Sequence, residues 1–380
     1  MTRIKKLNKH ASATFSSYLS AWPDLLFLVL DKLLEPIDHV RCAAVCKQWQ
    51  SLGKEYNLAT QRWSRVAPML MISGRSSTSM FSVSEGKSYI KNVQLPNKHN
   101  RICGSSHGWL AIVDKTSQDI TLVNPFAQAM VPINLPHFKE NVSKVILSAD
   151  PALNPTSYMV VAIYNSTKLA VLRGGEEDWN CIRLPDKLFD SLTDVIIYKG
   201  QIYAVSVCGK IVSINVNNCV INSSHSQESL DVRVFMTRSR KFRFRECDEA
   251  YLVESTKGHL WHVQRRNIGE TQFDGSILFE DGFRVDEVEF SDTDGCMVKH
   301  VEVESIGDEA LFLGKNYSVS VSASKLPWCL PNSIYFTGDL ESVMTIYDVD
   351  QLGTACAACD PNYGQKPPGL WITPPFKGLC

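Results

Sequence analysis

The chain has 380 residues, of which 44% are apolar, and a formal net charge of −1. A charge this close to zero argues against a protein that attracts nucleic acid or an anionic membrane surface by bulk electrostatics. The longest uninterrupted apolar run, residues 25–30, is far shorter than the ~20 residues that a membrane-spanning helix needs.

The N-terminal segment is basic, but no apolar stretch follows it. Residues 1–10 therefore do not resemble a secretory signal. We expect residues 1–19 to be a flexible N-terminus of an intracellular protein that resides in the nucleus, the cytoplasm or both. The twelve cysteines show no repeated spacing, which in an intracellular chain of this size is typical of reduced thiols that pack as small apolar side chains.

Residues 20–62 predict three short helices. Pro23 suits the first position of a helix, and Asp24 places a negative charge at the positive end of the helix dipole. The apolar residues of this helix cover an arc of roughly 200°, whereas a surface helix needs a stripe of only about 100°. They are Leu25, Leu26, Phe27, Val29, Leu30, Leu33 and Leu34, with Leu28 set apart among polar residues. Further helices are expected from Pro36 and over residues 45–52. So much apolar surface on a unit of about 40 residues predicts a module that docks on another protein.

The same residues resemble an F-box. The resemblance consists of a Leu-Pro-x-[DE]-Leu start, a central Asp-hydrophobic-x-Arg step and a Val-Cys-Lys-x-Trp end. The matching residues are Pro23, Asp24, Leu25, Asp38, Val40, Arg41, Val45, Cys46, Lys47 and Trp49. The sequence departs from the family at Trp22, where Leu is usual, and at Gln50, where Arg is common. The alternative is an ordinary helical cap that packs on the next domain.

An F-box implies docking on an SKP-type adaptor. The adaptor contacts that we expect are Trp22, Pro23, Leu25, Leu26, Val29, Leu30, Val45, Cys46 and Trp49.

From residue 63 to residue 352 the pattern changes to short apolar runs that are separated by Gly, Asn, Asp and Ser, which predicts strands and turns. The expected strands include residues 66–72, 108–114, 119–125, 158–164, 194–200, 201–207, 210–216, 250–255, 259–264, 310–316, 332–338 and 343–349. A strand, a Gly-centred turn and a second strand with an aromatic residue recur along this region. Meandering strands over such a length favour a β-propeller, and at about 40 to 50 residues per blade the region holds six or seven blades. The strand count favours six.

The fold class is therefore mainly β, with a small helical F-box in front of the propeller. Residues 353–380 are expected to be a C-terminal tail that packs on the propeller.

Three segments of this region resemble plant F-box proteins with a KIB-type β-propeller, a family whose propeller domain has no assigned function. They are "GSSHGWLAIVD", "ITLVNPFAQAMVPINLP" and "LPWCLPNSIYFTGD", and residues 332–337 are the most specific part. In this family the propeller is thought to recruit substrates. The resemblance implies no particular contact residues, so the substrate-binding residues stay unknown.

Motifs that carry chemistry are scarce. The sequence has no Gly-rich phosphate loop, no G-x-S-x-G elbow and no H-E-x-x-H helix. Cys356 and Cys359 have the spacing of half a zinc site, but the sequence has no second pair of this kind. Cys42 and Cys46 are four residues apart on a helix and have no further zinc ligand nearby in the sequence. His107 suits a structural role in a turn. His259 and His262 fall on opposite faces of one strand and should not share a site. We therefore expect no catalytic residue, no metal and no cofactor.

Residues 233–246 form the sharpest charged feature. Lys241, Arg243 and Arg245 alternate with Phe242 and Phe244, so one strand face is basic and the other aromatic. This face could grip an acidic partner or a single-stranded nucleic acid. An outer blade strand with its basic face in water is the interpretation that we favour.

Together these patterns predict a non-catalytic substrate receptor of a cullin-RING ubiquitin ligase. The F-box would bind the adaptor and, through it, the cullin, while the propeller would hold a protein substrate. Leu30→Asp is then expected to abolish adaptor binding and to leave the propeller folded. The alternatives are an interaction scaffold that acts without ubiquitination and a propeller that binds a small ligand or acts as an enzyme. Membrane and nucleic-acid partners are not expected.

Overall fold

A computed structural model of the chain describes most of its residues and divides it into two compact units. The units are Met1–Ala67 with Pro374–Cys380, and Pro68–Thr373. The described residues are 23–33, 36–60, 68–73, 78–84, 86–91, 100–126, 131–182, 184, 191–215, 232–237, 249–271, 277–290, 297–326, 328–337, 344–350, 353–356 and 369–374.

The described part of the first unit contains three helices. They are α2 (Pro23–Lys32), α3 (Pro36–Ala43) and α4 (Lys47–Thr60). Pro23 and Pro36 open their helices as the sequence predicts, because the first turn of a helix needs no N–H at its first position. Helix α4 extends beyond the expected end at residue 52 and brings Tyr56 to α2, where its hydroxyl donates a hydrogen bond of 2.9 Å to Asp31 Oδ1.

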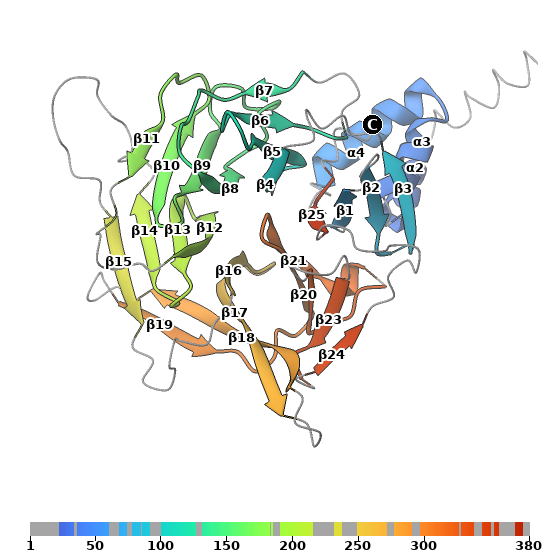
Figure 1. The fold of residues 1–380 in the computed structure, drawn as a ribbon. Helices are drawn as coiled ribbons and strands as arrows, with labels where there is room; N and C mark the ends of the chain where they lie inside the picture. The colour runs from blue at the N-terminus through green and yellow to red at the C-terminus, as the bar shows by residue number, and fades with distance from the viewer. Residues whose placement is uncertain are drawn as a thin grey trace, which may run out of the picture. The chain divides into compact units, whose positions relative to one another are not determined.

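The second unit is a six-bladed β-propeller, as the strand count favoured (Figure 1). Blade 1 consists of β25 (Leu370–Ile372), β1 (Met69–Ser73), β2 (Thr78–Ser82) and β3 (Lys87–Lys91). Blade 2 consists of β4 (Asn100–Ser106), β5 (Trp109–Asp114), β6 (Ile120–Val123) and β7 (Ile133–Asn134). Blade 3 consists of β8 (Val142–Leu147), β9 (Met159–Tyr164), β10 (Lys168–Arg173) and β11 (Asn180–Ile182).

The other three blades are less regular. Blade 4 consists of β12 (Leu192–Tyr198), β13 (Gln201–Ser206), β14 (Ile211–Asn215) and β15 (Val232–Thr237). Blade 5 consists of β16 (Glu249–Glu254), β17 (Leu260–Thr271), β18 (Ile277–Phe290) and β19 (Met297–Glu302). Blade 6 consists of β21 (Ser318–Ser322), β20 (Glu309–Leu313), β22 (Ser333–Thr337), β23 (Met344–Asp348) and β24 (Gly353–Cys356).

Two parallel pairings interrupt the antiparallel meander. Strand β20 runs parallel to β22 inside blade 6. Strands β15 and β19 pair in parallel through Met236 with Met297 and Thr237 with Val298, which joins blades 4 and 5 into one eight-stranded sheet.

The ring is closed by a strand from the end of the propeller sequence. Strand β25 pairs with β1 through Met69 with Ile372 and Leu70 with Trp371, so blade 1 contains both ends of the propeller. Closing the ring in this way leaves only short, protected sheet edges. The sequence analysis ended the propeller at residue 352, whereas the structure has two more of its strands, β24 and β25, after that residue.

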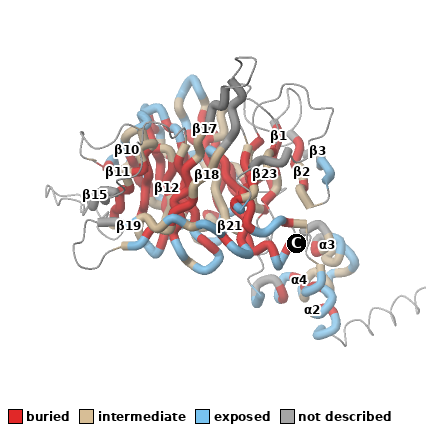
Figure 2. Tube along the Cα trace, turned by 90° about the horizontal axis from the view of Figure 1, so that it is seen from below, coloured by how far each residue is buried: buried red, intermediate tan, exposed pale blue. Residues whose placement is uncertain are grey.

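Strand faces pack between adjacent blades. Residues of β9 are buried along its whole length, because the sheet of blade 3 is covered on both faces. Figure 2 shows that buried residues run along the propeller strands, whereas exposed residues gather in the connecting loops. Polar contacts also cross the blade boundaries. Lys144 of β8 forms an ion pair of 2.6 Å with Asp194 of β12, and both side chains are buried. Asp194 Oδ2 in turn accepts a hydrogen bond of 2.9 Å from the backbone N–H of Leu252 in blade 5.

The turn between β12 and β13 illustrates the local signal that predicted these hairpins. Lys199 and Gly200 connect the paired residues Tyr198 and Gln201, and both turn residues have positive φ angles, 47° and 75°. Two positive φ angles define the type I′ turn, whose twist matches that of antiparallel strands, and glycine adopts this conformation without steric cost.

Candidate functional site

The helical unit has a small core of its own. Leu26, Leu30 and Tyr56 are buried in it, with exposed fractions of 5%, 1% and 4%. The partly buried residues around them are Phe27, Leu33, Cys42, Trp49 and Leu52. Positions 26 and 30 lie on one side of α2, and Leu33 continues that side directly after the helix, since i, i+4 and i+7 fall close together. This side of α2 is therefore used by the unit itself.

A second side of α2 is apolar and faces solvent. Leu25, Leu28 and Val29 are 53%, 65% and 42% exposed, and their i, i+3, i+4 spacing makes them one stripe along the helix. We call these three residues the α2 apolar stripe. Val45, after α3, is a further exposed apolar residue at 60%. Exposed leucine and valine side chains in a row are typical of a surface that another protein covers.

The residues that the sequence predicted as adaptor contacts divide between these two environments. Pro23, Leu25, Val29 and Val45 are exposed, and Cys46 and Trp49 are partly buried. Leu26 and Leu30 lie in the core of the helical unit, whereas Leu28, which was not among the predicted contacts, is in the α2 apolar stripe. Trp22 lies outside the described residues.

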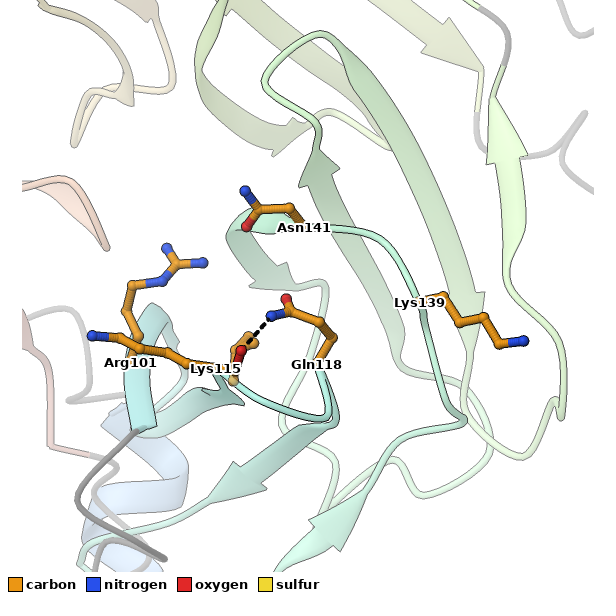
Figure 3. A pocket seen from close by; sticks show the side chains of 6 residues that line it. Arg101, Lys115, Gln118, Lys139 and Asn141 are labelled. Carbon is orange, nitrogen blue, oxygen red and sulfur yellow. Dashed lines mark hydrogen bonds between the residues drawn. The ribbon is translucent and has the colours of Figure 1, made fainter.

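The propeller has a basic recess of about 470 Å³, which is lined by Arg101, Val113, Lys115, Gln118, Lys139 and Asn141 (Figure 3). Its residues come from the start of β4, the end of β5, the β5–β6 turn and the segment before β8. The guanidinium of Arg101 donates to the backbone carbonyl oxygens of Val142 and Ser143, which fixes its position. Gln118 donates from Nε2 to the carbonyl oxygen of Lys115 at 3.0 Å.

Carboxylates of the neighbouring turns are bound to other partners. Asp119 accepts from His137 at 2.7 Å, and Glu140 accepts from Asn165 at 2.6 Å. None of the residues that line the recess is acidic. The recess can therefore accept an anionic group, such as a carboxylate or a phosphate.

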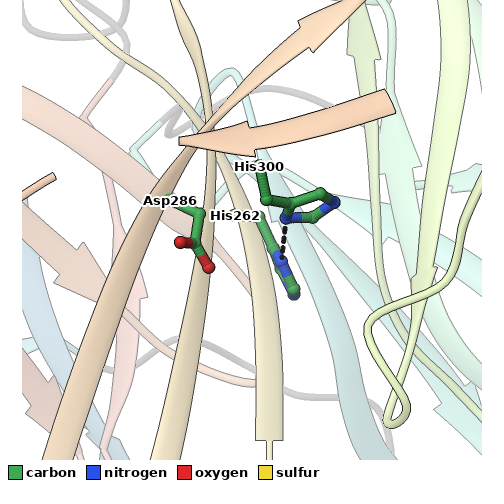
Figure 4. Close-up of side chains that lie close together, drawn as sticks. All are labelled: His262, Asp286 and His300. Atoms are coloured by element: carbon green, nitrogen blue, oxygen red, sulfur yellow. Dashed lines mark hydrogen bonds between the residues drawn. The ribbon is translucent and has the colours of Figure 1, made fainter. Parts of the chain in front are cut away.

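A second polar cluster lies inside blade 5 (Figure 4). His262 of β17, Asp286 of β18 and His300 of β19 bring their potential ligand atoms within 4.8 Å of one another. His262 and Asp286 are directly opposite each other in the pairing of β17 with β18, and they are 1% and 3% exposed. The Nδ1 atoms of His262 and His300 are 3.3 Å apart.

Arg284 and burial set the charges of this cluster. The guanidinium Nε of Arg284 donates to both carboxylate oxygens of Asp286 at 2.9 Å, and Nη2 donates to Oδ1 at 2.7 Å. Burial, followed by the proximity of His300 and Arg284, lowers the pKa of His262 well below its ordinary value, and burial also lowers the pKa of His300. Both imidazoles are therefore neutral at pH 7.

The sequence analysis missed this cluster. His262 was assigned no shared site because it was compared with His259, which instead contacts Glu287 through Nδ1 at 2.5 Å. The partners of His262 are 24 and 38 residues further along the chain, in β18 and β19. Only the strand register places them together, and the signal that could have found them is a His or Asp in each of three successive strands.

The other positions that the sequence singled out have local roles or lie outside the described residues. His107, with φ at 52°, and Gly108, with φ at 79°, form the two-residue turn between β4 and β5. Cys356 ends β24, and Cys359 and residues 241–248 lie outside the described residues. No helix among the described residues has the length and apolarity that crossing a membrane requires.

Comparisons with known proteins find similarity to plant proteins that are named as F-box proteins. F-box protein SKIP23 of Arabidopsis thaliana is 24% identical, over 83% of this chain and 83% of its own length. The candidate F-box protein At3g25750 of the same plant is 25% identical, over 83% of this chain and 85% of its own length. F-box protein At2g17036, also from this plant, is 23% identical over 92% of this chain and 93% of its own length.

Among solved structures, BBS1N in its complex with ARL6DN aligns with a TM-score of 0.39 and 10% identity, over 80% of this chain and 73% of that chain, which is too weak to support an argument. The model of the KIB1-4 beta-propeller family, in contrast, matches residues 80–353. This match covers most of the chain and nearly all of the propeller, and the chain therefore belongs to the KIB1-4 beta-propeller family.

Proposed function

We propose that this protein is a substrate-recognition subunit of a cullin-RING ubiquitin ligase inside the cell. In this proposal the helical unit docks on an SKP-type adaptor, and the propeller binds the protein that is to be ubiquitinated. The observation that carries the proposal is the α2 apolar stripe, which leaves Leu25, Leu28 and Val29 in solvent on a helix that already has a buried side. The similarity to F-box proteins over most of the chain supports the same assignment.

The helical unit would bind the adaptor by burying this stripe. Removing apolar side chains from water is the main source of binding energy in such contacts, and a few central residues usually supply most of it. Leu25, Leu28 and Val29 are the proposed central contacts, with Pro23 and Val45 as further exposed candidates. Leu26 and Leu30 support the stripe from inside the unit, since they fix the orientation of α2.

The propeller would contribute proximity and not bond chemistry. Holding a substrate next to the ubiquitin-loaded enzyme raises the effective concentration of a substrate lysine. We assign no catalytic residue and no cofactor to this role.

An interaction scaffold that binds the adaptor without ubiquitination is the alternative, and assembly tests it. The full chain is mixed with an SKP-type adaptor, a cullin and a RING subunit, and the complex is isolated by size exclusion. The proposal predicts one complex that contains all four proteins and supports ubiquitin transfer to proteins bound by the propeller. A chain that binds the adaptor but excludes the cullin would contradict the ligase role and favour the scaffold.

A further inference from the structure

The cluster inside blade 5 takes no part in adaptor docking, and its chemistry is that of a metal site. We propose that His262, Asp286 and His300 bind a divalent transition-metal ion, with zinc as the best fit. The inference does not depend on the ligase role.

The first argument is the donor set and its spacing. Two imidazole nitrogens and a carboxylate oxygen are ligands that zinc and its first-row neighbours accept. For tetrahedral zinc with Zn–N bonds of about 2.0–2.1 Å, two nitrogen ligands stand about 3.3 Å apart. The Nδ1 atoms of His262 and His300 are already 3.3 Å apart. One ring nitrogen of each histidine and one carboxylate oxygen lie within 4.8 Å of one another, so the three side chains can converge on one ion.

The second argument is that the protein already orients the carboxylate. A carboxylate has about four lone-pair sites, so Asp286 keeps free sites while Arg284 holds it from one side. Arg284 then orients the carboxylate, as residues around metal ligands commonly do.

The third argument is that a hydrogen bond between the two rings is a poor explanation of their contact. The Nδ1 atoms are 3.3 Å apart, longer than the about 2.7–3.2 Å of an ordinary N–H···O hydrogen bond. An ion between the rings would instead take a lone pair from each Nδ1 atom.

The fourth argument is access. His262 and Asp286 are buried, but His300 is only partly buried, and Glu302 beside it on β19 has a side chain that is 62% exposed. An ion can enter from this side, where a water molecule can supply the fourth ligand. The bound ion would link β17, β18 and β19, and it would stabilise the folded propeller because the unfolded chain does not present the three ligands together.

The test is metal content and thermal unfolding of the full chain. The purified protein is stripped with a chelator, loaded with Zn²⁺ or Co²⁺ and desalted, and the bound ion is counted by elemental analysis. The proposal predicts one ion per chain, a rise in unfolding temperature on loading, and a Co²⁺ spectrum without thiolate charge-transfer bands. The absence of those bands separates this site from the cysteines.

Three variants make the test specific. His262→Asn and His300→Gln should each lose the ion and the metal-dependent rise in unfolding temperature. His300→Gln alters the more exposed ligand, so its folding without metal can be checked against the stripped wild type. The matched control is His259→Asn, since His259 precedes the same strand but pairs with Glu287, and it should keep the ion. Retention of the ion by a folded His300→Gln variant, or no bound ion in the wild type, would overturn the proposal.

Discussion

Leucines of one short helix lie in opposite environments in this protein. Leu30 is 1% exposed and packs with Leu26 and Tyr56, whereas Leu25 is 53% exposed in the α2 apolar stripe. The sequence showed that the helix had more apolar surface than it needed, but it did not show which residues form the core. That division depends on where α4 crosses α2, which is a tertiary contact.

Two aspartate substitutions on α2 should therefore behave differently. Leu30→Ala alone is expected to cost about 2–5 kcal/mol of the stability of the helical unit, and Leu30→Asp adds the cost of a buried carboxylate and should unfold the unit. Leu25→Asp should leave the unit folded. Hydrogen exchange of α2 and α4 amides in the full chain distinguishes the two. Fast exchange in both variants would mean that Leu25 is also a core residue.

The ion pair of Lys144 and Asp194 is the second residue-scale feature with a clear energetic consequence. Both side chains are buried, and their 2.6 Å contact joins blades 3 and 4. Lys144→Met leaves the Asp194 carboxylate buried without its counter-ion and should lower the free energy of unfolding by about 3–5 kcal/mol. The double variant Lys144→Met/Asp194→Asn should recover part of this loss, because Asn still accepts from the Leu252 N–H.

Urea denaturation measures both effects. The control is Lys299→Met, which breaks an exposed ion pair of 3.1 Å with Glu289 and should cost less than about 1 kcal/mol. Equal losses for Lys144→Met and Lys299→Met would show that the Lys144 pair is not buried in solution.

At the scale of elements, the closing strand β25 makes the most direct prediction. Trp371 is fully buried in β25, and its indole N–H donates to the carbonyl oxygen of Leu313 in blade 6 at 2.9 Å. Trp371→Ala should lower the free energy of unfolding by about 3–5 kcal/mol, since it opens a cavity beside the strand that closes the ring.

Trp371→Phe isolates the hydrogen bond from the packing. This variant keeps an aromatic ring at the same place. It should lower the free energy of unfolding by about 1 kcal/mol for the lost hydrogen bond, and by a further amount for the small cavity that the smaller ring leaves. Thermal unfolding compares the two variants. An unchanged unfolding temperature in Trp371→Ala would contradict the placement of β25 in blade 1.

Elements differ in how well the sequence predicts them. Strands such as Met159–Tyr164 and Ser333–Thr337 were expected within a residue or two, because an apolar run between turn residues is a local signal. The pairing of β25 with β1 and the meeting of His262 with His300 are not local. They depend on ring closure and strand register, for which neighbouring residues carry no signal.

At the scale of the whole molecule, the chain is two units with separate cores. The core of the helical unit consists of α2, α3 and α4 residues, and the clusters between the blades consist of propeller residues. A chain that lacks residues 1–67 should therefore keep the β-sheet circular dichroism of the propeller and its unfolding temperature to within a few degrees. Loss of the cooperative transition in this truncated chain would show that the propeller needs the helical unit to fold.

The family assignment describes the propeller, whereas the proposed function depends mainly on the helical unit. The match covers residues 80–353, and the α2 apolar stripe lies before it. The relatives are named as F-box proteins, and the alignment with At2g17036 covers 92% of this chain, more than the residues that the family model matches. The central claim is therefore that the stripe binds an adaptor.

The measurement that tests this claim most directly is the affinity of the purified full chain for an SKP-type adaptor, determined by calorimetry for the wild type and for Leu25→Asp/Val29→Asp. The matched control is Val131→Asp, which places the same charge at an apolar propeller residue that is 79% exposed. We predict a one-to-one complex for the wild type and the control, and a loss of at least about 30-fold in affinity for the stripe variant, as expected when a hot spot worth about 2 kcal/mol is removed. Equal adaptor affinity for a folded stripe variant, or no binding by the wild type, would contradict the account.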